Sequence, residues 1–363
     1  MTPAQAPALA LVVKDVQPAL QSMLTGFEMM ALHGPIIEQQ PDFSLSLLPT
    51  LPEDQALLRQ HVADYESKVG LASGVLNCFQ GVRSTASHVL NMARVLEPVT
   101  ARLDKGPDLN RTYAADLERF QAAMEELSRV TTSLNPNDDS IAAQVAKVQH
   151  DLTAFRNSQI EDDVVRFKTG VKEAKYSGQI DTLKSQIANL LGEMNDLNQD
   201  IASGATSQIP QALAFGFAVG KTIATSTATG KLVVGVAFAI YDEIEKANAF
   251  SKEVKAKNEA LRGKIEQYRG LIGALLGDEQ QMAVLLTIAT HAEIYAENLE
   301  AVTKSVADLL QAYASLRRGF EGLALVDVPP RAGFFSAQLQ AAQAFWTEVE
   351  TTTGQALQLA RSS

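Results

Sequence analysis

Apolar residues recur along this chain at alternating steps of three and four, the spacing that lines one face of a helix packed against another helix. Four stretches follow the pattern closely: residues 58–79, 113–127, 180–201 and 299–320. Alternation with a period of two, which is typical of a half-buried strand, is nearly absent. The sequence therefore predicts an all-α protein whose long helices lie side by side.

Strong helix breakers are confined to a few places. We expect helices over residues 53–97, from after "DKGPDLN" to 134, over 140–202, over 242–318 with a bend or break near 270–277, and around 335–349. The third helix would be about 90 Å long at 1.5 Å per residue. The expected fold is an elongated bundle of about five long antiparallel helices with a hydrophobic head hairpin at one end. Residues 1–204 and 246–363 would form the two parts of the bundle, and residues 205–245 the head.

The predicted head lies in a stretch that avoids charge. Between Asp200 and Asp242 the only charged residues are Lys221 and Lys231, although charged residues make up 20% of the chain. The first arm of this stretch, residues 201–220, has the length of about 20 residues with which a helix crosses a bilayer. The sequence thus predicts a segment that can enter lipid.

The second arm allows two interpretations. Residues 222–241 match the first arm in length but place Lys231 in the middle, where a lysine is tolerated only if its charge reaches an interface. Alternatively, "KTIATSTATGK" is a polar tip that crosses to the far side of the bilayer, with both lysines beside lipid headgroups. The apolar run "LVVGVAFAIY" would then be a short returning arm.

The candidate site residues fall into three groups within this stretch. The predicted membrane-inserting positions are Ile209, Leu213, Phe215, Phe217, Val219, Ile223, Leu232, Val233, Val234, Val236, Phe238, Ile240 and Tyr241. Lys221 and Lys231 are placed at the head tip or the interface. The glycines expected to act as hinges or to allow close helix packing are Gly204, Gly216, Gly220, Gly230 and Gly235.

The charge-free stretch need not be permanently membrane-inserting. It could be a buried helix pair that caps the bundle, although few helices are available at the end of a long bundle to cover it. A sheltered soluble form and a later membrane form could also alternate. A different class of function is a coiled-coil scaffold or interaction protein whose apolar tip docks a protein partner.

A nucleotide site is excluded at the Gly-Lys-Thr triplet formed by Gly220, Lys221 and Thr222. A P-loop requires a glycine five positions before its second glycine, and Phe215 stands there. The residues before the triplet also lack the buried strand that such a loop follows.

Composition excludes several further functions. The chain has 42 acidic and 31 basic residues and a net charge of −11, which argues against a nucleic-acid partner. The single cysteine, Cys78, cannot form an intrachain disulfide and is expected to be a buried thiol on a helix. The five histidines (His33, His61, His88, His150 and His291) form no metal-ligand motif and are expected at surface or interhelical positions. The acidic groups Asp138-Asp139 and Glu161-Asp162-Asp163 suit a helix start and a solvated helix face, so we expect no catalytic residue, metal or cofactor.

This organisation resembles the cytolysin A family of α-helical pore-forming toxins, which includes components of haemolysin BL and of the non-haemolytic enterotoxin. The resemblance covers nearly the whole chain as architecture, and residues Ile209 to Tyr241 occupy the place of the family's membrane-inserting head. Two apolar arms are more similar to the component of multi-part toxins whose head supplies a full transmembrane hairpin. The lone Cys78 departs from cytolysin A itself, whose disulfide has no counterpart here.

The resemblance implies a non-enzymatic, secreted protein that rearranges, inserts its head into a target cell membrane and oligomerises into a pore, with related components as partners. It implies no small-molecule substrate. The N-terminal sequence has no basic residue before Lys14, so a cleavable signal peptide is not evident.

Overall fold

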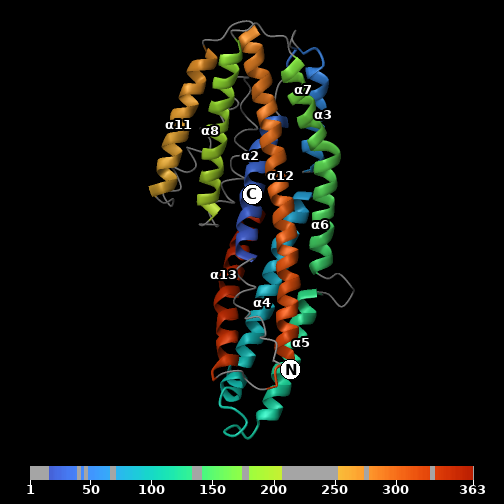
Figure 1. Cartoon of the computed structure of the whole chain (residues 1–363), viewed down its shortest axis with the longest axis vertical. Coiled ribbons are helices and arrows are strands. Elements are labelled where there is room, and N and C mark those ends of the chain that lie inside the picture. Colours follow the sequence, from blue (N-terminus) through green and yellow to red (C-terminus); the bar gives the residue numbers. More distant parts are fainter. Residues whose placement is uncertain are drawn as a thin grey trace. The chain divides into compact units, whose positions relative to one another are not determined.

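The computed structural model describes residues 16–38, 42–44, 48–65, 71–132, 141–173, 180–206, 252–273, 278–327 and 332–362. Within these ranges the regular elements are helices, and no β-strand occurs among them (Figure 1). The helices are α2 (Val16–Glu38), α3 (Leu51–Ala63), α4 (Leu71–Leu103), α5 (Tyr113–Thr132), α6 (Ile141–Phe155), the π-helix η3 (Arg156–Ile160), α7 (Glu161–Glu173), α8 (Ile180–Thr206), α11 (Lys252–Gly273), α12 (Asp278–Ala324) and α13 (Phe334–Ser362). The all-α class predicted from the heptad pattern is confirmed.

The chain divides into two compact units, each assembled from segments that are distant in sequence. The first unit consists of residues 1–20, 73–150 and 304–358, and the second of residues 21–72, 151–303 and 359–363. Helix α12 belongs to both units, since the division falls within it, between Thr303 and Lys304.

The core of the first unit lies between α4, α5, α13 and the second part of α12. Phe120 of α5 packs edge-on against Phe335 of α13, with ring centroids 4.8 Å apart. Trp346 and Phe79 are also buried. The predicted apolar seam of α12 is confirmed at Val306, Leu309, Leu316 and Phe320, and that of α5 at Phe120, Met124 and Leu127, because all are buried.

Polar side chains close the connections of the first unit. The Asp104 carboxylate accepts hydrogen bonds from the backbone N–H groups of Phe335 and Ser336, each at 3.0 Å, and so satisfies free donors at the start of α13. The buried carboxylate of Asp116 accepts two hydrogen bonds from Arg102, at 2.8 and 2.6 Å. Gly106, in the connection between α4 and α5, has φ +76°, a left-handed conformation that glycine adopts without a Cβ clash.

The helices of the second unit alternate in direction. Lys168 of α7 pairs with Glu293 of α12, and Arg156 of η3 lies 3.5 Å from Glu300, so α7 and α12 are antiparallel. On the other side, α11 is antiparallel to both α12 and α8 (Figure 1). It follows that α7 and α8 run in opposite directions.

The expectation of one helix over residues 140–202 is therefore wrong. The segment contains α6, η3, α7 and, after a reversal of direction, α8. Heptad spacing continues on both sides of the reversal because each helix packs against a neighbour, so the pattern by itself does not reveal the turn. The Ser177-Gly178 pair was the available breaker signal. The longest described helix is α12, with 47 residues, and it does not flank the charge-free segment.

Other helix bounds differ less from expectation. The break near 270–277 is confirmed, since α11 ends at Gly273 and α12 begins at Asp278. The predicted helix over 53–97 corresponds to α3 and α4, with residues 66–70 outside the described residues. Helix α2 was missed, because Pro18, Gly34 and Pro35 resemble breakers.

Candidate functional site

The charge-free stretch begins in the last turns of α8, and the described chain resumes at Lys252, the start of α11, beyond the end of the stretch at Tyr241. Residues 207–251 lie outside the described residues, and with them every predicted membrane-inserting position from Ile209 to Tyr241, Lys221, Lys231, Gly216, Gly220, Gly230 and Gly235. Gly204, the remaining predicted hinge, lies in the last turns of α8. The described residues next to the segment therefore belong to α8 and α11.

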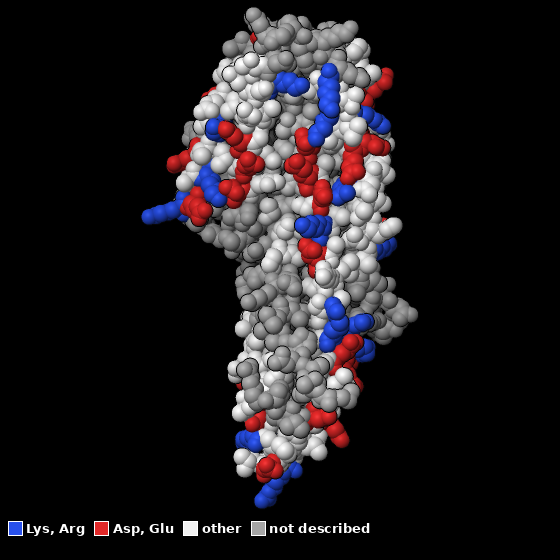
Figure 2. Space-filling model, in the orientation of Figure 1, with Lys and Arg blue, Asp and Glu red and all other residues white. Residues whose placement is uncertain are grey.

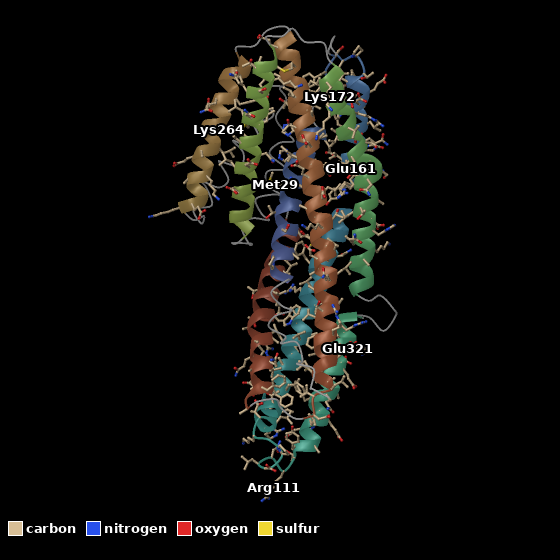
Figure 3. The ribbon with its side chains drawn as sticks, in the orientation of Figure 1. Met29, Arg111, Glu161, Lys172, Lys264 and Glu321 are labelled. Carbon is tan, nitrogen blue, oxygen red and sulfur yellow. The ribbon has the colours of Figure 1, made fainter. Side chains whose placement is uncertain are left out.

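Helices α8 and α11 bring the two ends of the segment together. They lie side by side in the second unit, and Lys257 Nζ of α11 is 3.1 Å from Asp200 Oδ2 of α8 (Figure 1). Two turns further along, Lys264 pairs with Glu193 (Figure 3). These contacts fix an antiparallel register, so the end of α8 and the start of α11, which bracket residues 207–251, lie at the same end of the helix pair.

An apolar seam holds the α8–α11 pair together. Ile187, Leu191 and Met194 of α8 are buried, as is Leu261 of α11. The seam predicted over residues 180–201 is thus confirmed at Ile187 and Met194, while Leu183, Leu190 and Leu197 are half-buried. Tyr268 joins α11 to α12 through a hydrogen bond of 2.6 Å between its hydroxyl and that of Thr287. Burial raises the pKa of Tyr268, so this hydroxyl stays protonated.

Acidic side chains gather beside the α8–α11 helix pair. Glu297 of α12 is partly buried, and burial is the main reason that its pKa is raised. The nearby carboxylates of Glu293, Asp196 and Glu300 raise the pKa further. Lys168 acts in the opposite direction. Figure 2 shows acidic side chains clustered over this part of the second unit. The surface around α8 and α12 is therefore unlike a nucleic-acid interface, which is rich in Lys and Arg.

None of the helices that the structure describes has both the length and the apolar character required to cross a bilayer. That search does not include residues 207–251, which hold the charge-free arms. Within the same described ranges, no group of three or more His, Cys, Asp or Glu side chains is arranged to hold a metal ion.

Two of the histidines that are far apart in sequence meet in the second unit. Nδ1 of His33, on α2, lies 3.0 Å from Nδ1 of His291, on α12, and both side chains are buried. Burial lowers the pKa of His291 to about 4. The pKa of His33 is lowered well below 6.5, first by burial and then by His291. Sequence reasoning missed this pair because its members are separated by 258 positions.

A third histidine, His61 of α3, has its Nδ1 2.6 Å from a carboxylate oxygen of Asp163 on α7. Asp163 is 1% exposed, so the expectation that residues 161–163 form a solvated face is wrong at this position, although Glu161 and Asp162 are exposed. Asp163 was misplaced because α7 turns it towards α3, and its two acidic neighbours concealed that orientation. Burial raises the pKa of Asp163, and the hydrogen bond from His61 opposes that rise.

Cys78 is a free, buried thiol on α4, as expected. Desolvation raises the pKa of Cys78 to about 12, which keeps the thiol protonated and unreactive. Among the described residues, its surroundings are those of a small apolar side chain in a core.

No family model matches the chain, and no curated protein matches it in sequence. Solved structures do match: the chain is similar to soluble SmhA of the tripartite alpha-pore forming toxin Smh from Serratia marcescens, with 13% identity, 94% of each chain covered and a TM-score of 0.62. It is also similar to the HblL1 toxin component of Bacillus cereus, with 15% identity, 93% of this chain and 95% of that chain covered, and a TM-score of 0.64.

A third match is soluble AhlB of the tripartite alpha-pore forming toxin AHL from Aeromonas hydrophila, with 10% identity, coverage of 95% and 93%, and a TM-score of 0.56. These likenesses extend over nearly the full length of each chain and establish the fold. The chain has the helical fold of tripartite α-pore-forming toxin components, as the resemblance drawn from the sequence predicted.

Proposed function

We propose that this protein is a component of a pore-forming toxin that inserts residues 201–241 into a target membrane. The observation that carries the proposal is the charge-free segment, which lies between the two helices of one antiparallel pair, α8 and α11, in a fold shared with toxin components. The partners are a lipid bilayer and copies of this chain or related components. The protein acts without enzymatic chemistry, and its site of action is a target cell membrane after secretion.

Insertion has a clear driving force. Removing apolar surface from water contributes roughly 25 cal/mol per Å², so two arms that carry Phe215, Phe217, Leu232 and Phe238 gain substantially in lipid. Lipid offers no hydrogen bonds to the backbone, so the arms must satisfy their own amides, which favours a helical hairpin. In this account Gly204 and the other predicted glycines permit the change of backbone conformation, and Lys221 and Lys231 stay beside the headgroups.

The deciding experiment pairs membrane leakage with thermal stability. Val236→Asp places a carboxylate in the second apolar arm, and such a charge near the bilayer centre costs roughly 2.5 to 3.5 kcal/mol on insertion scales. We expect dye release from liposomes, measured with the chain alone and with the products of neighbouring genes, to fall on the order of a hundredfold. The melting temperature should change little.

Leu109→Asp provides the matched control, because Leu109 is 78% exposed in the connection before α5. It adds the same charge at an apolar position outside the segment and should leave leakage intact. If Val236→Asp instead lowers the melting temperature strongly, and the unmodified chain never binds liposomes, the segment is a permanent core element. A scaffold function would then replace the proposed one.

A further inference from the structure

Helices α2 and α12 approach closely along one face in the second unit. A Cβ atom on Gly26 of α2 would lie 2.7 Å from Val302 Cγ2 and 3.1 Å from the backbone oxygen of Asn298. A side chain at Gly26 would therefore force Val302 or the α12 backbone to shift. His33 follows Gly26 by seven residues on α2, and His291 precedes Asn298 by seven residues on α12. The two contacts therefore belong to one antiparallel register. The histidine pair thus lies on the closely packed α2–α12 seam, two turns from its tightest point.

Apolar side chains surround the pair on both helices. Met29 and Met30 of α2 and Ile294 of α12 are buried (Figure 3). His33 and His291 are 3% and 5% exposed. Two imidazoles therefore occupy positions where the remainder of the seam excludes water.

The pair has one geometry that is compatible with neutral rings. One Nδ1 carries a proton and donates it to the other Nδ1, which accepts with its lone pair. Neither Nε2 atom has a hydrogen-bond partner among the described residues. When both rings are protonated, the two Nδ1–H groups face each other at 3.0 Å and the hydrogen bond is lost.

Within the described residues, no hydrogen bond joins either ring of the pair to a carboxylate. His291 is the one group whose charge acts on His33, and burial alone acts on His291. The titratable groups nearest along these helices have other partners: His61 of α3 faces Asp163 of α7, and Glu297 of α12 interacts with Lys168, Asp196 and its own acidic neighbours. An imidazolium here would be a buried, unpaired charge, which is strongly unfavourable.

We propose that the α2–α12 seam is a pH-sensitive contact, in which protonation of His33 and His291 releases α2 from α12. This inference goes beyond the proposed function and does not depend on it, because it concerns the chain in the absence of lipid. Release would expose the part of α12 around Val302 that packs on Gly26, so acidification would prepare the second unit for rearrangement.

The direction of the pH effect follows from proton linkage. A histidine whose pKa is lowered in the folded state stabilises that state fully above about pH 6.5 and progressively less as the pH falls. For His291, with a pKa of about 4 in the closed contact, the closed state loses on the order of thirtyfold in population relative to the open state at pH 5. His33 adds to this loss because its pKa is shifted in the same direction.

Hydrogen–deuterium exchange on the full chain tests the proposal. Protection of residues 21–38 and 285–302 should fall at least tenfold between pH 7.5 and pH 5, after correction for intrinsic exchange and relative to α5 in the first unit. Unchanged relative protection of α2 at pH 5 in the unmodified chain would overturn the proposal, without any variant and without reference to membrane activity.

Variants assign the effect to the pair. His33→Gln with His291→Gln keeps a hydrogen-bonding pair that does not titrate, so the pH dependence of α2 protection should disappear. His33→Leu with His291→Leu serves the same purpose if the amide pair does not fold. His61→Gln and the exposed His150→Gln are controls that should retain the wild-type pH response. If the response persists in a folded variant without His33 and His291, the assignment to this pair is wrong.

Discussion

The buried carboxylate of Asp116 in the first unit accepts hydrogen bonds from three residues, whereas His33 and His291 in the second unit share one between them. The first unit also caps α13 through Asp104. In the second unit, described buried atoms without a hydrogen-bond partner include both histidine Nε2 atoms and Gln159 Oε1 of the π-helix η3. Unsatisfied buried polar groups typically cost about 1–3 kcal/mol each.

The difference teaches where a change of conformation would start. Buried polar atoms without a partner occur in both units, since His88 Nε2 of the first is one of them, but the second unit carries more of the described ones, together with the π-helical turn and both helices that flank the charge-free segment. Regions of lower local stability are the ones that open first, and functional rearrangements draw on them. We therefore expect the first unit to keep its structure under conditions in which the second unit rearranges.

The largest expected effect tests how tightly the core of the first unit is packed. Phe335→Ala removes a ring that is fully buried and packs edge-on against Phe120. It should lower the free energy of unfolding of this unit by about 3–5 kcal/mol, measured by denaturant titration with exchange protection of α5 and α13 as the local readout. A loss below about 1 kcal/mol would show that the first unit is not the tightly packed region described here.

The matched substitution in the second unit is Leu261→Ala on α11. Leu261 is fully buried against α8, but the helix pair can partly collapse on the cavity, so we expect a loss of about 2–3 kcal/mol. Exchange should rise in residues 187–194 and 252–273 while α5 and α13 stay protected. Equal loss of protection in both units would contradict the comparison, because it would mean that they unfold together.

Sequence periodicity predicted the helices and their buried faces, but not their directions. The seam of α12 is correct at Leu299, Val302 and Val306, because heptad spacing depends only on which side chains face a neighbour. The reversal between α7 and α8 keeps that spacing, so the sequence suggested one long helix. Direction depends on contacts such as Lys168–Glu293, which are distant in sequence.

The candidate site was predictable to a different extent. The absence of charge between Asp200 and Asp242 is a direct property of the sequence, and the neighbouring α8–α11 pair follows the predicted seam. The predicted inserting residues and the domain bounds at 204 and 246 stay predictions. The histidine pair and the burial of Asp163 required the tertiary fold, because no local pattern distinguishes a paired histidine from an exposed one.

Loss of the cap on α13 is expected to have a smaller effect than the core substitutions. Asp104→Ala removes the acceptor for the N–H groups of Phe335 and Ser336, which water can partly replace at a helix end. The expected loss is about 1–2 kcal/mol, seen by denaturant titration. Asp104→Asn should recover part of it, because the amide oxygen still accepts one hydrogen bond. No recovery would assign the effect to charge rather than to capping.

The smallest expected effect concerns the ion pair at the base of the charge-free segment. Lys257 and Asp200 side chains are 31% and 58% exposed, so water and salt screen their attraction. A double-mutant cycle with Lys257→Ala and Asp200→Ala should give a coupling energy below about 1 kcal/mol, decreasing further in high salt. A weak pair here means that Leu261 and its apolar neighbours, rather than charge, hold α8 and α11 together where the segment begins. A salt-independent coupling energy well above about 1 kcal/mol would instead show that this ion pair holds α8 and α11 together. The second unit would then be more stable at this helix pair than at the α2–α12 seam.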